Sequence, residues 1–198
     1  MNLDLASMAF PLRFRPGQPV SDEELLRFCA ANDALRVERE ANGEILVMSP
    51  ANSRTSQINA RICRFLTQWA DDNNVGISFD SSGGFRLPDG SIRSPDASWV
   101  SRSRWSSLSD AQQASFPPIC PDFVIELRSP SDKLAAAQAK MKMWIENGAL
   151  EAWLIDPERT EISVYRSDDS LEQYFDPSSV QGHGVIAGFE LVMANVWK

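Results

Sequence analysis

Three charged residues occupy positions where a folded chain seldom places charge without a reason. Asp96 directly follows a proline, Glu126 interrupts an apolar run, and Lys140 lies on the helix predicted after that run. An ionised carboxylate buried in a strand costs free energy unless a cation or hydrogen bonds compensate it. Carboxylates around Mg²⁺ would provide that compensation, because hard cations prefer oxygen ligands. These residue types therefore suggest a divalent-cation site with an amine beside it.

The position of Lys140 on its helix supports this interpretation. At about 100° per residue, Met141 and Trp144 fall within about 40° of Ala137 and form an apolar stripe. Lys140 lies about 60° from Ala137, on the flank of that stripe, whereas Lys142 falls on the polar side. We therefore expect Lys140 to reach towards the strand that carries Glu126, and Lys142 to face water.

Each of the three residues also has an ordinary structural explanation. Asp96 could cap a turn after its proline, and Glu126 could pair with an arginine. Lys140 could simply extend its stem along apolar surface. Taken singly, these explanations are at least as strong as a catalytic role, and it is the three residues in this order that favour a site.

The N-terminal part of the chain predicts a helix followed by a β-hairpin. Ser21–Glu24 has the form of a capping box and precedes apolar residues at helical spacing. Residues 35–40 and 44–48 flank Asn42-Gly43, a strong hairpin signal, and Pro50 ends the second strand. Two antiparallel strands are therefore expected here.

The remainder of the chain predicts strands that alternate with long helices. Apolar residues at spacings of three and four predict an amphipathic helix from Ser53 to near Asn73, and a second helix is expected from Ser131-Asp132 to about Asn147. The polar segment 101–118 predicts a connection with one helical turn. Strands are predicted at 76–79, 85–87, 97–100, 123–127, 152–155 and 162–165, the last as an edge strand. This order favours an α/β fold with a mixed central sheet flanked by helices.

Extended motifs surround the three charged residues. Ser94-Pro95-Asp96-Ala97 is similar to a PD half-motif, and residues 122–132 are similar to PD-x-V-x-E-x-x-S-P-S-D. Residues 140–157 are similar to K-x-x-x-Y-x-x-x-G-x-x-E-x-W-L-I-D-P. On these residues the chain resembles the Uma-two family of restriction endonucleases, a branch of the PD-(D/E)XK nuclease superfamily. The resemblance covers most of residues 20–198.

The resemblance implies a fold, a reaction and a site. It implies one restriction-endonuclease-like domain over residues 1–198, with 1–20 as an N-terminal extension and an antiparallel hairpin after it. Asp96 and Glu126 would hold one or two Mg²⁺ or Mn²⁺ ions, and a bound water would attack a DNA phosphodiester. Lys140 would orient or help deprotonate that water and stabilise the phosphate. An isologous homodimer would suit the cutting of both DNA strands.

The sequence departs from the family pattern in three places. Arg128 stands where the D/E-x-K text has lysine, and arginine cannot act as a base, so the lysine role maps to Lys140. Arg128 could instead clamp a phosphate. Trp144 replaces the usual tyrosine, a change expected to affect packing more than chemistry. The helix from residue 53 lacks an early carboxylate, so Glu38 on the hairpin is the best stand-in for a further acidic ligand.

Composition limits the other possible functions. The net charge of -8 counts against a protein that binds nucleic acid mainly by neutralising its phosphates. With one histidine, and with three cysteines that form no C-x-x-C pair, neither a His-rich nor a zinc site is indicated. No apolar run is long enough for a membrane span, and the start lacks a signal-peptide pattern, so a cytoplasmic protein is expected.

Two alternatives stay open at this point. A catalytically inactive nuclease-fold domain that acts as a binding or assembly module is favoured by the acidic charge and by Arg128 in the lysine position. A different hydrolase or a phosphotransfer enzyme is weakened because the chain has neither a G-x-x-x-x-G-K-[ST] loop nor a nucleophile motif.

Overall fold

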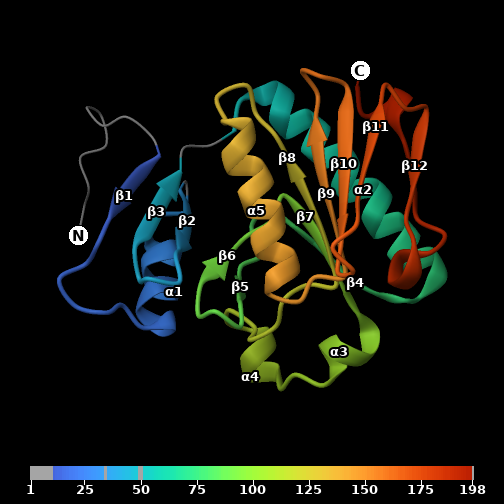
Figure 1. Cartoon of the computed structure of the whole chain (residues 1–198). Coiled ribbons are helices and arrows are strands. Elements are labelled where there is room, and N and C mark those ends of the chain that lie inside the picture. Colours follow the sequence, from blue (N-terminus) through green and yellow to red (C-terminus); the bar gives the residue numbers. More distant parts are fainter. Residues whose placement is uncertain (1–10, 34, 49–50, 198) are drawn as a thin grey trace.

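The computed structural model describes residues 11–33, 35–48 and 51–197. A six-stranded sheet with the order β11-β10-β9-β8-β7-β4 lies at its centre (Figure 1). Strands β8 and β9 are parallel and the other neighbours are antiparallel, so the sheet is mixed. Its strands are β4 (Gly76–Asp80), β7 (Ala97–Ser101), β8 (Phe123–Leu127), β9 (Glu151–Asp156), β10 (Glu161–Arg166) and β11 (Leu171–Phe175).

Two long helices cover opposite faces of this sheet. Helix α2 (Ser53–Asn73) packs its buried residues, among them Ile62 and Leu66, against one face. Helix α5 (Leu134–Glu146) packs Met141 and Trp144 against the other. Because side chains alternate along a strand, β8 contributes to both cores and all five of its residues are buried.

A second sheet lies beside the central one and has the order β1-β3-β2-β6-β5. Helix α1 (Asp22–Ala31) begins at the predicted capping box on Ser21 and packs Leu25 into the core of this sheet. The predicted hairpin is confirmed, since β2 pairs antiparallel with β3 and Gly43 has the positive φ of its turn. The strands are β1 (Leu12–Phe14), β2 (Arg36–Arg39), β3 (Ile45–Met48), β5 (Phe85–Arg86) and β6 (Ile92–Arg93).

The N-terminal extension predicted over 1–20 contributes β1, which pairs with β3. Residues 1–10 and Pro50, the predicted end of the second hairpin strand, lie outside the described residues. The single-domain organisation stays a prediction. Within the described part of the chain, none of the helices is both long and apolar enough to cross a membrane.

Three local predictions were wrong. Strand β10 is not an edge, because β11 pairs with residues 161–165 of it. The cap of α5 is Lys133, while Asp132 accepts hydrogen bonds from Ser129 instead. The segment 101–118 holds two short helices, α3 (Arg102–Ser106) and α4 (Asp110–Gln113).

The chain ends in a small hairpin that covers part of the α2 side. Strands β12 (Ser179–Gln181) and β13 (Glu190–Val192) pair antiparallel, and short 3₁₀ turns lie at 184–186 and 193–195. Val180 and Leu191 of this hairpin pack into the core beneath α2. The hairpin therefore belongs to the face opposite α5.

Candidate active site

Glu126 and Lys140 form a direct ion pair between the sheet and α5. Glu126 lies on the α5 face of β8 and is 7% exposed. Lys140 Nζ lies 2.9 Å from its Oε1, and the indole Nε1 of Trp144 donates to the same oxygen at 2.8 Å. Lys142 is exposed, as predicted. The helical spacing of residues 140 and 144 thus directs two N–H donors at one carboxylate.

Asp96 lies immediately before β7 and is held by hydrogen bonds to both carboxylate oxygens. Oδ2 accepts from the backbone N–H of Leu127 at 2.8 Å, which ties Asp96 to the end of β8. Oδ1 accepts from Nη1 of Arg36 at 2.7 Å. Asn59 of α2 donates to the Asp96 carbonyl at 3.0 Å. Asp96 is therefore fixed by groups from β2, α2 and β8.

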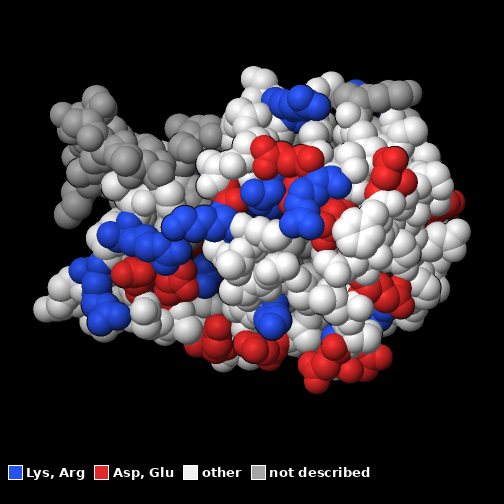
Figure 2. Space-filling view, turned by 45° about the horizontal axis from the view of Figure 1, so that its top comes forward, with Lys and Arg blue, Asp and Glu red and all other residues white. Residues whose placement is uncertain are grey.

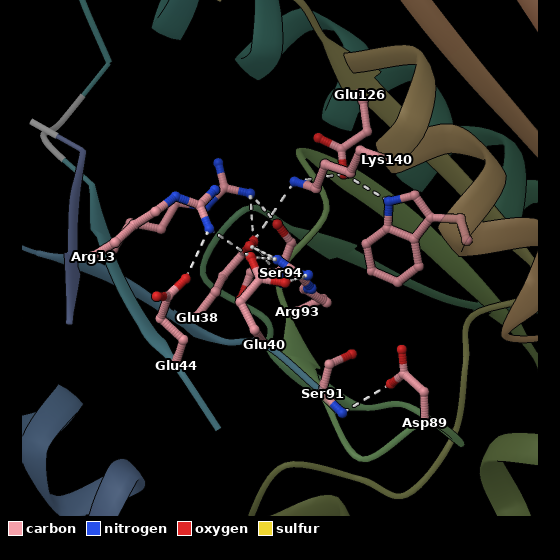
Figure 3. Close-up of polar contacts among 12 residues, drawn as sticks. Arg13, Glu38, Glu40, Glu44, Asp89, Ser91, Arg93, Ser94, Glu126 and Lys140 are labelled. Carbon is pink, nitrogen blue, oxygen red and sulfur yellow. Dashed lines mark hydrogen bonds and ion pairs between the residues drawn. The ribbon is translucent and has the colours of Figure 1, made fainter. Parts of the chain in front are cut away.

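Glu38 of β2 connects the second sheet to this cluster. It is 1% exposed, and its Oε1 lies 3.6 Å from Lys140 Nζ and 3.9 Å from Arg36 Nη2. Arg93 donates to its Oε2 at 3.0 Å, and the backbone N–H of Ser94 donates to Oε1 at 3.2 Å (Figure 3). Three cationic side chains thus surround one buried carboxylate.

Burial and charge shift the pKa values of the cluster in different directions. Burial raises the pKa of Glu126 above its ordinary value, and Lys140 only partly offsets this effect. Burial also disfavours the ionised form of Glu38, but Lys140, Arg36 and Arg93 outweigh it and lower the pKa of Glu38 to about 2. Burial lowers the pKa of Lys140, yet Glu126 and Glu38 raise it more, so its net shift is upward. Lys140 is therefore an ammonium group in this arrangement.

The structure brings the predicted residues into one network, with Asp96 joined to it through a residue that the sequence interpretation missed. Lys140 contacts Glu126 and Glu38 directly, whereas Asp96 is linked to Glu38 by Arg36. Arg36 lies in the predicted hairpin, two residues before Glu38, so alternation along the strand places both side chains on one face. The two-residue spacing of Arg36 and Glu38 was the sequence signal that could have identified Arg36 as part of the network.

Trp144 and Arg128 both contact acidic residues of the central sheet. Trp144, expected to affect packing more than chemistry, is fully buried in the core beneath α5 and also donates a hydrogen bond to Glu126. Arg128 points to another set of groups, because its Nη1 lies 2.8 Å from Asp156 and 3.2 Å from Glu158. Its use as a phosphate clamp stays a prediction.

The carboxylates of the cluster match a hard divalent cation in chemical type. Asp96 and Glu126 offer the oxygen ligands that Mg²⁺ and Mn²⁺ prefer. Among the described residues, no three His, Cys, Asp or Glu side chains are gathered into a ready-made metal-binding group. Lys140 and Arg36 provide the positive charge instead, so a cation at these carboxylates would have to displace or shift them. The ligand chemistry fits, and water would complete the coordination.

One face of the molecule carries both signs of charge. On the face drawn in Figure 2, basic side chains lie directly beside acidic ones. Trp105, the one tryptophan in a polar, arginine-containing segment, packs on Phe79 with ring centroids 5.0 Å apart, and its neighbour Arg104 pairs with Asp122. Core packing therefore accounts for Trp105.

The comparisons with known proteins agree with the motifs. Residues 22–194 match the model of the Uma2 family, which is described as "Putative restriction endonuclease". A crystal structure from Anabaena variabilis, described as "a putative nuclease belonging to DUF820", superposes with a TM-score of 0.70 at 19% identity. The match covers 90% of this chain and 98% of that one, and at this identity it establishes the fold alone. None of the curated proteins matches the chain.

Proposed function

This chain belongs to the Uma2 family, and from that premise we propose that it is a metal-dependent endonuclease that hydrolyses phosphodiester bonds in DNA. The observation that carries the proposal is the position of Lys140. Its ammonium lies between Glu126 and Glu38, and Arg36 extends the same network to Asp96. Acid groups from two sheets and an amine from a helix thus lie together, and Asp96, Glu126 and Lys140 belong to segments that resemble the family motifs.

Asp96 and Glu126 would hold one or two Mg²⁺ or Mn²⁺ ions, with Glu38 as a supporting acid. When bound, the metal would lower the pKa of a water molecule and neutralise charge that develops on the phosphate. Burial raises the pKa of Glu126, and a cation bound beside it would favour its ionised form, as the ammonium of Lys140 does.

Lys140 would act as a hydrogen-bond donor. Its pKa is shifted upward by Glu126 and Glu38, so its amine stays protonated and cannot take a proton from water in this arrangement. An ammonium beside the carboxylates can instead orient the attacking water and stabilise a phosphate oxygen. Of the two roles considered for this lysine, the geometry supports orientation and charge stabilisation.

DNA is the proposed substrate, and a homodimer is the proposed assembly. The formal charge of -8 makes long-range attraction to DNA weak, so we expect cleavage to depend on the metal and on local contacts. Arg128 would serve as a phosphate clamp only after leaving Asp156. Two copies related by a two-fold axis would present one site to each strand of a duplex.

Plasmid nicking in Mn²⁺ tests the function, with EDTA as the metal-free reference. We expect the wild type to nick supercoiled DNA, and Asp96→Asn and Lys140→Ala to be slower by at least about 100-fold, since each removes a group at the reacting centre. Lys142→Ala is the matched control, because Lys142 lies on the same helix but faces water. It should cut at the wild-type rate.

Two outcomes would overturn the proposal. Equal nicking by all four proteins would indicate contamination or a different site. A folded wild type that neither nicks DNA nor binds Mn²⁺ would favour the inactive nuclease-fold module, in which Lys140 and Arg36 permanently neutralise the carboxylates.

A further inference from the structure

Strand β11 forms one edge of the central sheet and leaves two large apolar side chains exposed. Its hydrogen-bonded neighbour is β10, and no other strand of the described residues pairs with it. Leu171 and Phe175 are 51% and 66% exposed, the highest values among the large hydrophobic side chains of the described residues. Proteins usually protect such edges with lysine, proline or a bulge, and β11 contains neither lysine nor proline.

On its outer side, the backbone of β11 has hydrogen-bonding groups that no strand of the described residues pairs with. Arg166 N donates to Ser170 O, and Asp176 N donates to Thr160 O, which fixes the hydrogen-bonded positions of the β10–β11 pair. Because these positions alternate in an antiparallel pair, Glu172 and Tyr174 bond inward. The N–H and C=O groups of the other three residues therefore point away from the sheet, namely those of Leu171, Gln173 and Phe175.

From this pattern we propose that β11 pairs antiparallel with β11 of a second copy, about a two-fold axis through Gln173. In that register Leu171 lies opposite Phe175 of the second copy, and Phe175 lies opposite its Leu171. The three outward-facing positions meet one another, and each such pair exchanges two backbone hydrogen bonds. The two exposed apolar side chains of each copy cover those of the other.

The opposite face of the strand is compatible with the same register. Glu172 lies opposite Tyr174 of the second copy, and within one chain the Tyr174 hydroxyl already donates to Glu172 at 2.6 Å. Arg166 lies 3.0 Å from Glu172 and balances its charge. No two like charges lie directly opposite each other in this register, and the two Glu172 side chains, which are diagonal neighbours, are each paired with Arg166 of their own chain.

Neighbouring registers are unfavourable. Shifting the axis by one residue sets Glu172 opposite either Glu172 or Asp176 of the second copy, and like charges directly opposite are destabilising. Shifting it by two residues sets Gln173 opposite either Pro177, which has no N–H to donate, or Asp169, which lies in a turn with positive φ. The register centred on Gln173 is the one that the sequence allows.

Sedimentation of the full chain, without DNA or metal, tests this interface separately from nuclease activity. The wild type is expected to sediment as a dimer of about 44 kDa, twice the 22.0 kDa of one chain. Leu171→Lys and Phe175→Glu should each weaken self-association by at least about tenfold, because each places a charge opposite an apolar side chain at two symmetry-related positions. Val185→Lys, at an apolar residue that is also exposed, is the control and should leave the dimer unchanged.

The double variant L171K/F175E tests the register itself. The two introduced charges face each other across the axis only when residue 171 lies opposite residue 175, so the dimer should return and should weaken again at high salt. Far-UV circular dichroism confirms that each variant is folded. A monomeric wild type, a dimer that survives both single substitutions, or a double variant that stays monomeric would each overturn the proposal.

Discussion

The indole Nε1 of Trp144 donates a hydrogen bond of 2.8 Å to Oε1 of Glu126. Lys140 approaches the same oxygen at 2.9 Å, so one turn of α5 supplies both donors to a single buried acid. A residue that the sequence identified with packing thereby supports the acid that carries the proposed chemistry. The positions of Lys140 and Trp144 at Glu126 depend on how α5 is placed against β8.

Replacing Trp144 with phenylalanine should destabilise the protein by about 2–4 kcal/mol, because the change leaves a small cavity and removes a hydrogen bond to a charged group. Trp99→Phe is a matched control, since Trp99 is 2% exposed and its Nε1 has no hydrogen-bond partner among the described residues. Urea unfolding of both variants should show the larger loss for Trp144. Equal losses would mean that the hydrogen bond contributes little.

Glu38 predicts a pH dependence of stability. Its pKa in the folded protein is about 2, below the ordinary value of 4.5, so the ionised form favours folding. This contribution is fully present above about pH 4.5 and is lost as the pH falls towards 2. The free energy of unfolding of wild type should therefore exceed that of Glu38→Gln near neutral pH, and the difference should shrink on acidification. A difference that does not change between pH 6 and pH 2 would contradict the assignment.

Mn²⁺ should stabilise the folded protein if Asp96 and Glu126 bind it. A ligand that binds only the native state, at a concentration 100 times its dissociation constant, adds about 2.7 kcal/mol to the free energy of unfolding. Calorimetry detects this increase as a raised Tm. Asp96→Asn should lose most of this increase, while Glu190→Gln, an exposed acid on β13, should keep it. The same rise in all three proteins would place the cation elsewhere.

Arg128 should matter for stability, because it pairs with Asp156, which is 2% exposed. Arg128→Ala leaves that carboxylate buried without its charged partner, and we expect a loss of about 2–3 kcal/mol. Arg27→Ala removes one partner of an ion pair with Glu23 in which both side chains are exposed, and it should cost less than about 1 kcal/mol. Thermal unfolding that ranks the two variants in the reverse order would contradict this view of the ion pairs.

The sequence alone determined the elements whose signals are local. The capping box at Ser21, the Asn42-Gly43 turn and the apolar periodicity of residues 53–73 each predicted an element that the structure contains. Helical spacing also placed Lys140 towards the sheet and Lys142 towards water. These features depend on residues within a few turns of one another, which is the range over which backbone preference and side-chain periodicity act.

Only the tertiary structure decided which distant residues meet. Arg36 and Asp96 are 60 positions apart, and their contact requires the second sheet to dock beside the end of β7. Strand order also determines that β11 pairs with β10. It likewise places Arg128 beside Asp156 and not beside the cluster around Glu126. Local sequence patterns determine the direction in which a side chain points from its helix or strand. Long-range packing determines which distant residues it contacts. The physical reason is that burial and charge compensation act on the whole fold, so no single segment encodes them.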